Sequence, residues 1–194
     1  MKKYSKVTPE GTKDLLFEEC LINRMVEQKL SQVFVSRGFH EVVTPAMEFM
    51  DVFDPETSGI APEIMYKMSD RRGRLVVMRP DSTMPIARLA ATRLQNEEKP
   101  LRLYYTQRIY RNNPSLTGGS DGVLQSGVEL LGASGKRADL EAIATAVEAL
   151  SHCTPDFRLE LGHAGFFRAI AAQLPISPEQ REDIRSTIEA KNYA

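Results

Sequence analysis

Residues 123–131 read VLQSGVELL, an alternating stretch that follows a polar loop. Neighbouring side chains of a strand point to opposite faces, so Gln125, Gly127 and Glu129 share one face. An amide and a carboxylate beside a glycine make a poor hydrophobic surface, and glycine leaves volume open above the sheet. We interpret this face as the floor of a polar pocket. An ordinary solvent-facing sheet surface is the alternative, and spacing alone favours it slightly.

The loop before this strand is rich in Asn, Gly, Ser and Pro, and it separates the strand from a second expected strand at 101–111. If the two strands pair antiparallel with Arg111 opposite Gln125, then Gln107 faces Glu129. The floor would then carry a fixed cation, a carboxylate and amides. These are the groups that recognise the carboxylate and ammonium of a free amino acid.

A second motif, RPDSTMPIAR at 79–88, lies where a predicted strand meets a predicted helix. From the start of that helix, Asp81 and Thr83 can both point toward a ligand. Local chemistry alone favours a simpler role, in which both residues only cap the helix.

The remaining pattern indicates an α+β fold with a mainly antiparallel sheet flanked by helices, because neighbouring strands are joined as hairpins. We expect Asp14 to cap the first helix, and Ser177 with Gln180 to open the last one as a capping box. Apolar spacing predicts helices at 15–36, 82–94, 136–152 and 165–173, and strands at 39–44, 64–69, 74–79 and 157–161.

The composition of the chain excludes some classes of function. The 194 residues are 42% hydrophobic, and their net charge of -1 disfavours nucleic-acid binding. No apolar segment reaches membrane length and no signal peptide is evident. Cys20 and Cys153 lie far apart and are expected to be reduced, so we expect a cytoplasmic protein.

No catalytic or metal-binding constellation emerges from the sequence. The three histidines are scattered, and none has the spacing of a metal site or a catalytic dyad. The glycine-rich stretch 117–122 carries no basic residue and no helix follows it, which argues against a phosphate-binding loop. It is interpreted as a mobile hairpin tip. We therefore assign no catalytic residue, no metal and no cofactor.

These motifs together resemble the histidyl-tRNA synthetases and their relatives, which have the class II synthetase fold. The similar segments are PEGTKD at 9–14, GFHEVVTP at 38–45, RPDST at 79–83, the pair Tyr110-Arg111 with QSGVE at 125–129, and LGHAGFF at 161–167. The resemblance covers nearly all of this chain, but the chain covers only about the first half of such a protein. It implies one class II domain over 1–194, in which 164–194 begins an inserted helical subdomain.

Two departures point to one branch of that family. The synthetases carry glutamate where this chain has Asp81, and they carry a glutamate and arginines for ATP in the loop that corresponds to 112–121. Adenylation needs positive charge at the reacting phosphates, which this loop does not offer, and Asp121 would repel them. The chain is therefore similar to the regulatory subunits of ATP phosphoribosyltransferase, which are non-catalytic and sense histidine.

That resemblance implies a role for each pocket residue. Arg111 and Gln125 would hold the carboxylate and backbone of histidine, Asp81 and Thr83 its ammonium, and Glu129 its imidazole. The implied partner is the short catalytic subunit of ATP phosphoribosyltransferase, in a hetero-oligomer built on dimers of this chain.

Two other functions stay open at this point. An active histidyl-tRNA synthetase, or a fragment of one, is the enzymatic alternative. A binding module that senses a different ligand through the same fold is the third hypothesis. Segment 38–45 resembles class II motif 1, whose proline lies at the dimer interface, so we expect self-association around 39–45.

Overall fold

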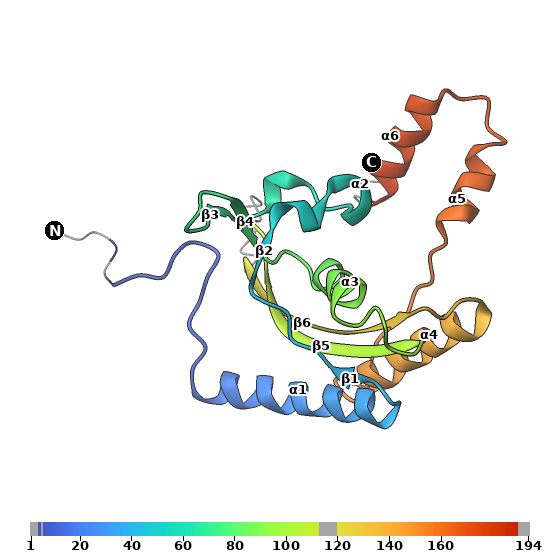
Figure 1. Cartoon of the computed structure of the whole chain (residues 1–194). Helices are drawn as coiled ribbons and strands as arrows, with labels where there is room; N and C mark the ends of the chain where they lie inside the picture. The colour runs from blue at the N-terminus through green and yellow to red at the C-terminus, as the bar shows by residue number, and fades with distance from the viewer. Residues whose placement is uncertain (1–3, 5, 113–119, 190–194) are drawn as a thin grey trace. The chain divides into compact units, whose positions relative to one another are not determined.

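The computed structural model describes residue 4, residues 6–112 and residues 120–189, and it divides into two compact units, 1–157 and 158–194 (Figure 1). The first unit contains two small sheets and most of the helices. The second is a pair of helices. Within the described residues, no helix is long and apolar enough to cross a membrane.

The main sheet of the first unit has the strand order β1-β5-β6. Strands β5 (Leu101–Tyr110) and β6 (Gly122–Leu131) form a long antiparallel hairpin, whereas the short β1 (His40–Glu41) pairs parallel with β5. The expected α+β class and the expected long hairpin are confirmed.

Helices cover both faces of this hairpin. Helix α1 (Phe17–Ser36) and helix α4 (Lys136–Ser151) pack on the face that carries Tyr104. Helix α3 (Thr83–Thr92) packs on the other face, where Ile86 meets the odd-numbered side chains of β5. Figure 1 shows α1 and α3 on opposite sides of β5 and β6. The pocket face of β6 is therefore the one that faces α3.

A second antiparallel sheet lies beside η1 (Met50–Phe53) in the order β2-β4-β3. Its strands are β2 (Met47–Phe49), β4 (Leu75–Met78) and β3 (Lys67–Ser69). Val77 of β4 is fully buried against Phe53. Two short helical segments, α2 (Pro55–Ser58) and η2 (Pro62–Ile64), lie between β2 and β3 in the chain.

The second unit consists of α5 (Ala164–Ala171) and α6 (Pro178–Glu189). The expected capping box at the start of α6 is confirmed. The Ser177 backbone N–H donates to Gln180 Oε1 at 2.8 Å, and the Gln180 N–H donates to Ser177 Oγ at 3.2 Å. These two bonds satisfy backbone donors that a helix start otherwise leaves free.

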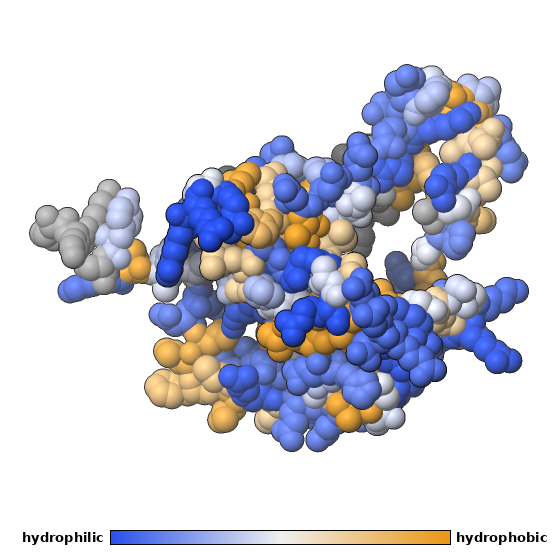
Figure 2. Space-filling view, viewed as in Figure 1, coloured by the Kyte–Doolittle hydropathy of each residue, from blue (hydrophilic) through white to orange (hydrophobic). Residues whose placement is uncertain are grey.

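The first helix departs from expectation. It begins at Phe17 with Leu16 as its N-cap residue, and no side chain caps it, so the expected Asp14 cap is wrong. Only the C-terminal end of the helix buries side chains, Val33 and Phe34, because the sheet contacts that end. The first half leaves apolar side chains exposed, and Figure 2 shows a hydrophobic surface there.

Several expected strands are shorter or absent. The strand expected over 39–44 is only two residues long, and 62–64 is a 3-10 helix before β3. The strand expected over 157–161 is absent, since none of the described strands pairs with this segment, and Leu161 is exposed. Strand β2 was not expected, because a proline precedes it and its residues alternate over only three positions.

Candidate functional site

The site forms where the start of α3 meets the hairpin. The backbone N–H of Thr83 donates to Asp81 Oδ1 at 2.8 Å, so Asp81 does bind the first turn of α3. Asp81 precedes the N-cap residue Ser82, and its bond to Thr83 occupies only one of its carboxylate oxygens. The other oxygen, Oδ2, accepts a hydrogen bond from Gln125 Nε2 at 3.2 Å. Asp81 therefore links the helix to the strand.

A second bond completes the link. The Thr83 hydroxyl donates to Glu129 Oε1 at 2.7 Å. Gln125 and Glu129 stand on the same face of β6, on either side of Gly127, so both bonds reach the same strand from the start of α3. The structure thus brings together Asp81, Thr83, Gln125 and Glu129 in one polar cluster.

Arg111 joins this cluster from the end of β5. Its Nε donates to the Pro80 carbonyl at 2.8 Å, and its Nη2 lies 3.6 Å from Asp81 Oδ2. The Arg111 side chain is 45% exposed, against 17% for Asp81. Part of the guanidinium therefore stays accessible for an anionic group.

The assumed strand register was wrong. Gln107 pairs with Gln125, and Glu129 pairs with Leu103. The Arg111 backbone N–H donates to the Asp121 carbonyl at 2.8 Å, so pairing continues to the base of the loop, and each partner lies four residues from the assumed one. An even shift preserves the faces, which is why the site still assembles.

Gln107 is also not part of the site. It is 5% exposed, and its amide bonds the backbone N–H of Thr44 at 3.2 Å and the Thr44 hydroxyl at 3.1 Å. Both bonds lead away from Asp81 and Glu129, so this amide ties β5 to the segment that follows β1.

The space above Gly127 is not open, contrary to expectation. A Cβ atom on Gly127 would lie 2.7 Å from the Tyr105 hydroxyl and 3.0 Å from its Cζ. The glycine therefore makes room for an aromatic ring. The sequence analysis did not identify Tyr105. The correct register would have pointed to it, because it places this aromatic residue opposite a glycine.

Charge in the cluster is predominantly negative. Burial raises the pKa of Glu129, nearby Asp81 raises it further, and the Thr83 hydrogen bond partly opposes both effects. Within the described part of the chain, Gln125 Oε1 is buried without a hydrogen-bond partner. Two carboxylates and a free amide oxygen suit a ligand that brings N–H donors and positive charge.

A cavity of about 430 Å³ opens at the edge of the cluster, and Gln125 and Glu129 are not among the residues that line it. Asp81, Thr83 and Arg111 line one side of it. The other side is formed by the end of α2 and the residues after it, which sequence reasoning did not assign: Thr57, Ser58, Gly59 and Ile60. This volume falls in the usual range for small-ligand pockets.

The expected ATP-loop difference lies mostly outside the described residues, because 113–119 belong to the part that is not described. Asp121, at the end of that loop, is 8% exposed and accepts a hydrogen bond from the Tyr66 hydroxyl. Among the described residues, no group of three or more His, Cys, Asp or Glu could hold a metal ion.

Comparison with known proteins places the chain in a family. The family model for histidyl-tRNA synthetase matches residues 11–194. The chain belongs to the histidyl-tRNA synthetase family. Within that family, two curated relatives called ATP phosphoribosyltransferase regulatory subunit cover the whole chain, at 42% identity in Clostridium novyi and 43% in Clostridium acetobutylicum. The chain spans about half of their length, 46% and 47%.

Solved structures give the same family. A Bacillus halodurans protein described as an ATP phosphoribosyltransferase regulatory subunit/histidyl-tRNA synthetase superposes with a TM-score of 0.89 and 29% identity, over 100% of this chain and 50% of that one. Apo histidyl-tRNA synthetase of S. aureus gives a TM-score of 0.63 and 27% identity, over 75% of this chain and 34% of that one. The class II synthetase-like fold is therefore confirmed.

Proposed function

We propose that this chain supplies the histidine-sensing site of an ATP phosphoribosyltransferase regulatory subunit and has no catalytic activity of its own. The observation that carries the proposal is the cluster in which Asp81 bonds Gln125 and Thr83 bonds Glu129. It offers acceptors for an ammonium and an imidazole N–H, while Arg111 remains available for a carboxylate. The names of the curated relatives favour the regulatory branch.

Histidine binding by calorimetry tests the proposal. We expect the wild-type chain to bind histidine and Glu129→Gln to weaken binding by about 1–3 kcal/mol, the cost of poorly matching a buried polar group. The substitution keeps the shape and removes the charge. Glu98→Gln, on an exposed loop, is the matched control and should bind like the wild type.

Each outcome has a distinct meaning. Equal affinities of wild type and Glu129→Gln would remove Glu129 from the site. No histidine binding by the wild type would leave only the fold in common with the family, and the sensing role would be rejected.

An active histidyl-tRNA synthetase is the second candidate, because the matching family model carries that description. The segment 112–121 contains no Lys or Arg to stabilise charge on the reacting phosphates. We therefore expect no histidine-dependent exchange of pyrophosphate into ATP. Detectable exchange would overturn the non-catalytic assignment.

The proposed partner is the short catalytic subunit of ATP phosphoribosyltransferase, in a cytoplasmic hetero-oligomer. Histidine can regulate that assembly only if it binds one arrangement more tightly than another, because a ligand with equal affinity for both shifts nothing. Activity of the catalytic subunit, measured with and without this chain and histidine, tests the coupling. Identical activity in all four mixtures would contradict it.

We also propose that the chain self-associates through 39–45. This segment includes β1, an edge strand of the main sheet, and the 74% exposed side chain of Val43. Sedimentation at about tens of micromolar, where weak dimers form, should show dimers that Val43→Glu disrupts. Leu75→Glu, at another exposed apolar position, is the control. A wild type that is monomeric under these conditions would argue against the interface.

A further inference from the structure

Tyr105 lies at the centre of the polar cluster. In the hairpin it pairs directly with Gly127, the residue between Gln125 and Glu129. It is only 5% exposed, and its ring packs in the hydrophobic cluster beneath α3 that includes Ile86. The ring is thus anchored in the core.

The Tyr105 hydroxyl lies beside Gly127 and close enough to Thr83, Asp81 and Glu129 to interact with them electrostatically. Burial, together with the nearby carboxylates of Glu129 and Asp81, raises the pKa of Tyr105 to about 12, and hydrogen bonding with Thr83 opposes this only in part. The phenol therefore stays neutral at physiological pH and keeps its proton. It is a neutral hydrogen-bonding group beside two carboxylates.

The contact with Gly127 fixes where this hydroxyl lies. The calculated Cβ position on Gly127 is 2.7 Å from Oη and 3.3 Å from Cε1 of Tyr105. Any side chain at position 127 would push the hydroxyl out of its place. A glycine in the middle of a strand lowers strand stability, and here it permits the close approach of one particular phenol.

We propose that Tyr105 is a specificity-determining residue of the site, whose hydroxyl pairs with Glu129 to recognise a nitrogen-bearing ring on the ligand side chain. This inference rests on the proposed amino-acid-binding function and deepens it. Glu129 accepts from one ring nitrogen, and the phenol supplies the second polar contact.

A site built from buried hydrogen-bonding groups rejects ligands that lack the matching polar atoms, because those groups are then left unpaired. An amino acid whose side-chain ring has the same size but no nitrogen therefore separates the contribution of hydrogen bonding from that of shape. β-(2-Thienyl)alanine has such a ring. The wild type should prefer histidine to this analogue, and Tyr105 should contribute a defined part of the preference.

The test is the ratio of the two dissociation constants, measured by calorimetry on the full chain. We expect Tyr105→Phe to weaken histidine binding about tenfold, the effect of losing one hydrogen bond, and to leave the binding of thienylalanine nearly unchanged. A purely structural role would weaken both ligands equally, and an equal loss would overturn the proposal. If the wild type binds neither ligand, the proposed function itself fails.

A double-mutant cycle tests the proposal by a second, independent route. Gly127→Ala should weaken histidine binding by displacing the hydroxyl. In the Tyr105→Phe background the closest contact is gone, so the same substitution should have a smaller effect. Additive losses would show that Gly127 and Tyr105 act independently and would contradict the proposal.

Discussion

Gln107 and Gln125 face each other across the β5–β6 hairpin, yet their amides differ in how completely they are bonded. Gln107 is buried and uses both ends of its amide on Thr44. Gln125 uses its nitrogen on Asp81, while its oxygen has no partner among the described residues. Buried polar groups are normally satisfied. A fully bonded amide is typical of a structural role, whereas the free oxygen of Gln125 can still accept a hydrogen bond, as the proposed function requires.

The same contrast between complete and incomplete hydrogen bonding distinguishes the surroundings of Arg79 from the polar cluster of the site. Arg79 is 4% exposed and donates to the carbonyls of Thr44, Pro45 and Arg108. Asp81, which lies two residues after Arg79, belongs to the polar cluster of the site, in which carboxylates outnumber basic side chains. The Arg79 guanidinium has acceptors around it, whereas the polar cluster keeps an acceptor, Gln125 Oε1, without a donor among the described residues.

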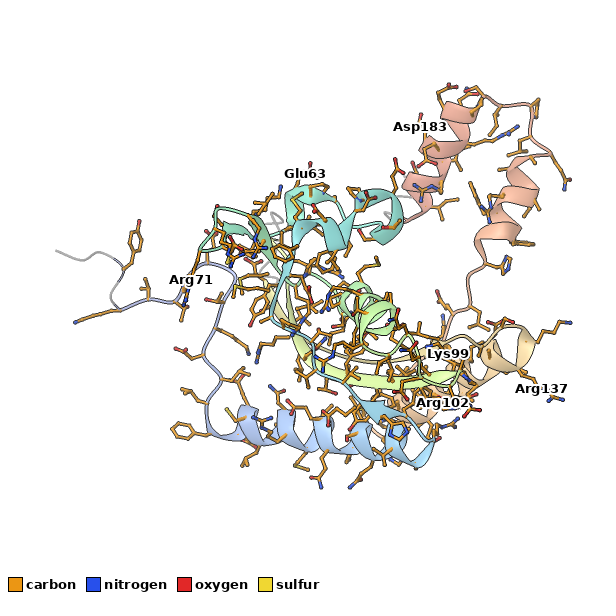
Figure 3. All side chains as sticks on the ribbon, viewed as in Figure 1. Glu63, Arg71, Lys99, Arg102, Arg137 and Asp183 are labelled. Atoms are coloured by element: carbon orange, nitrogen blue, oxygen red, sulfur yellow. The ribbon has the colours of Figure 1, made fainter. Side chains whose placement is uncertain are left out.

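The largest expected effect comes from removing the hydrogen bonds of Arg79. Arg79→Met should lower the free energy of unfolding by about 3 kcal/mol, because it leaves buried carbonyls without donors. Urea unfolding measures this. Arg71→Met, in the turn between β3 and β4 (Figure 3), is the control and should change stability little. A decrease in the free energy of unfolding below about 1 kcal/mol would show that the hydrogen bonds of Arg79 are not essential for stability.

The next effect compares the same substitution at Glu48, a buried glutamate that is paired with an arginine, and at Glu129 of the polar cluster. Glu48 accepts two hydrogen bonds from Arg88, at 2.6 and 3.0 Å. Glu48→Gln should cost about 2 kcal/mol of stability, since it breaks a charged, bidentate pair. Glu129→Gln should cost none, because burial already disfavours its charge. Equal losses in thermal or urea unfolding would erase the distinction between the two glutamates.

The two facing glutamines give a smaller effect. Gln107→Leu should lower the free energy of unfolding by about 1 kcal/mol by leaving the Thr44 N–H unpaired, with histidine affinity unchanged. Gln125→Leu should instead weaken histidine binding and leave stability nearly unchanged. Measuring both properties on both variants sharpens the comparison, and a reversed pattern would refute it.

The smallest effect is a pH dependence. Glu129 has a raised pKa in the folded protein, so it binds its proton more tightly there than in the unfolded chain. Its stabilising contribution is present at low pH and is lost as pH rises through the raised value. The stability of Glu129→Gln relative to wild type should therefore increase between about pH 4 and about pH 7. A constant difference would show that Glu129 is not desolvated.

The sequence predicted the hairpin and the proximity of Asp81, Thr83, Arg111, Gln125 and Glu129, because strand alternation and a helix start are local patterns; their role in binding a ligand stays a prediction. It did not predict the register, since the bond from Arg111 to Asp121 depends on how the loop closes. It also missed Tyr105, whose position depends on its partner across the sheet. The exposed first half of α1 shows the same limit, because helical periodicity does not say which turns meet the core.

The N-terminal turn has a consequence for mutational tolerance. Gly11 has φ +72°, and a Cβ atom there would lie 2.3 Å from the carboxylate of Asp121, whose backbone N–H donates to the Gly11 carbonyl. Every other amino acid would therefore combine a strained backbone with a steric conflict. In a saturation library selected for function, position 11 should lose all missense alleles, although a surface turn ordinarily accepts many.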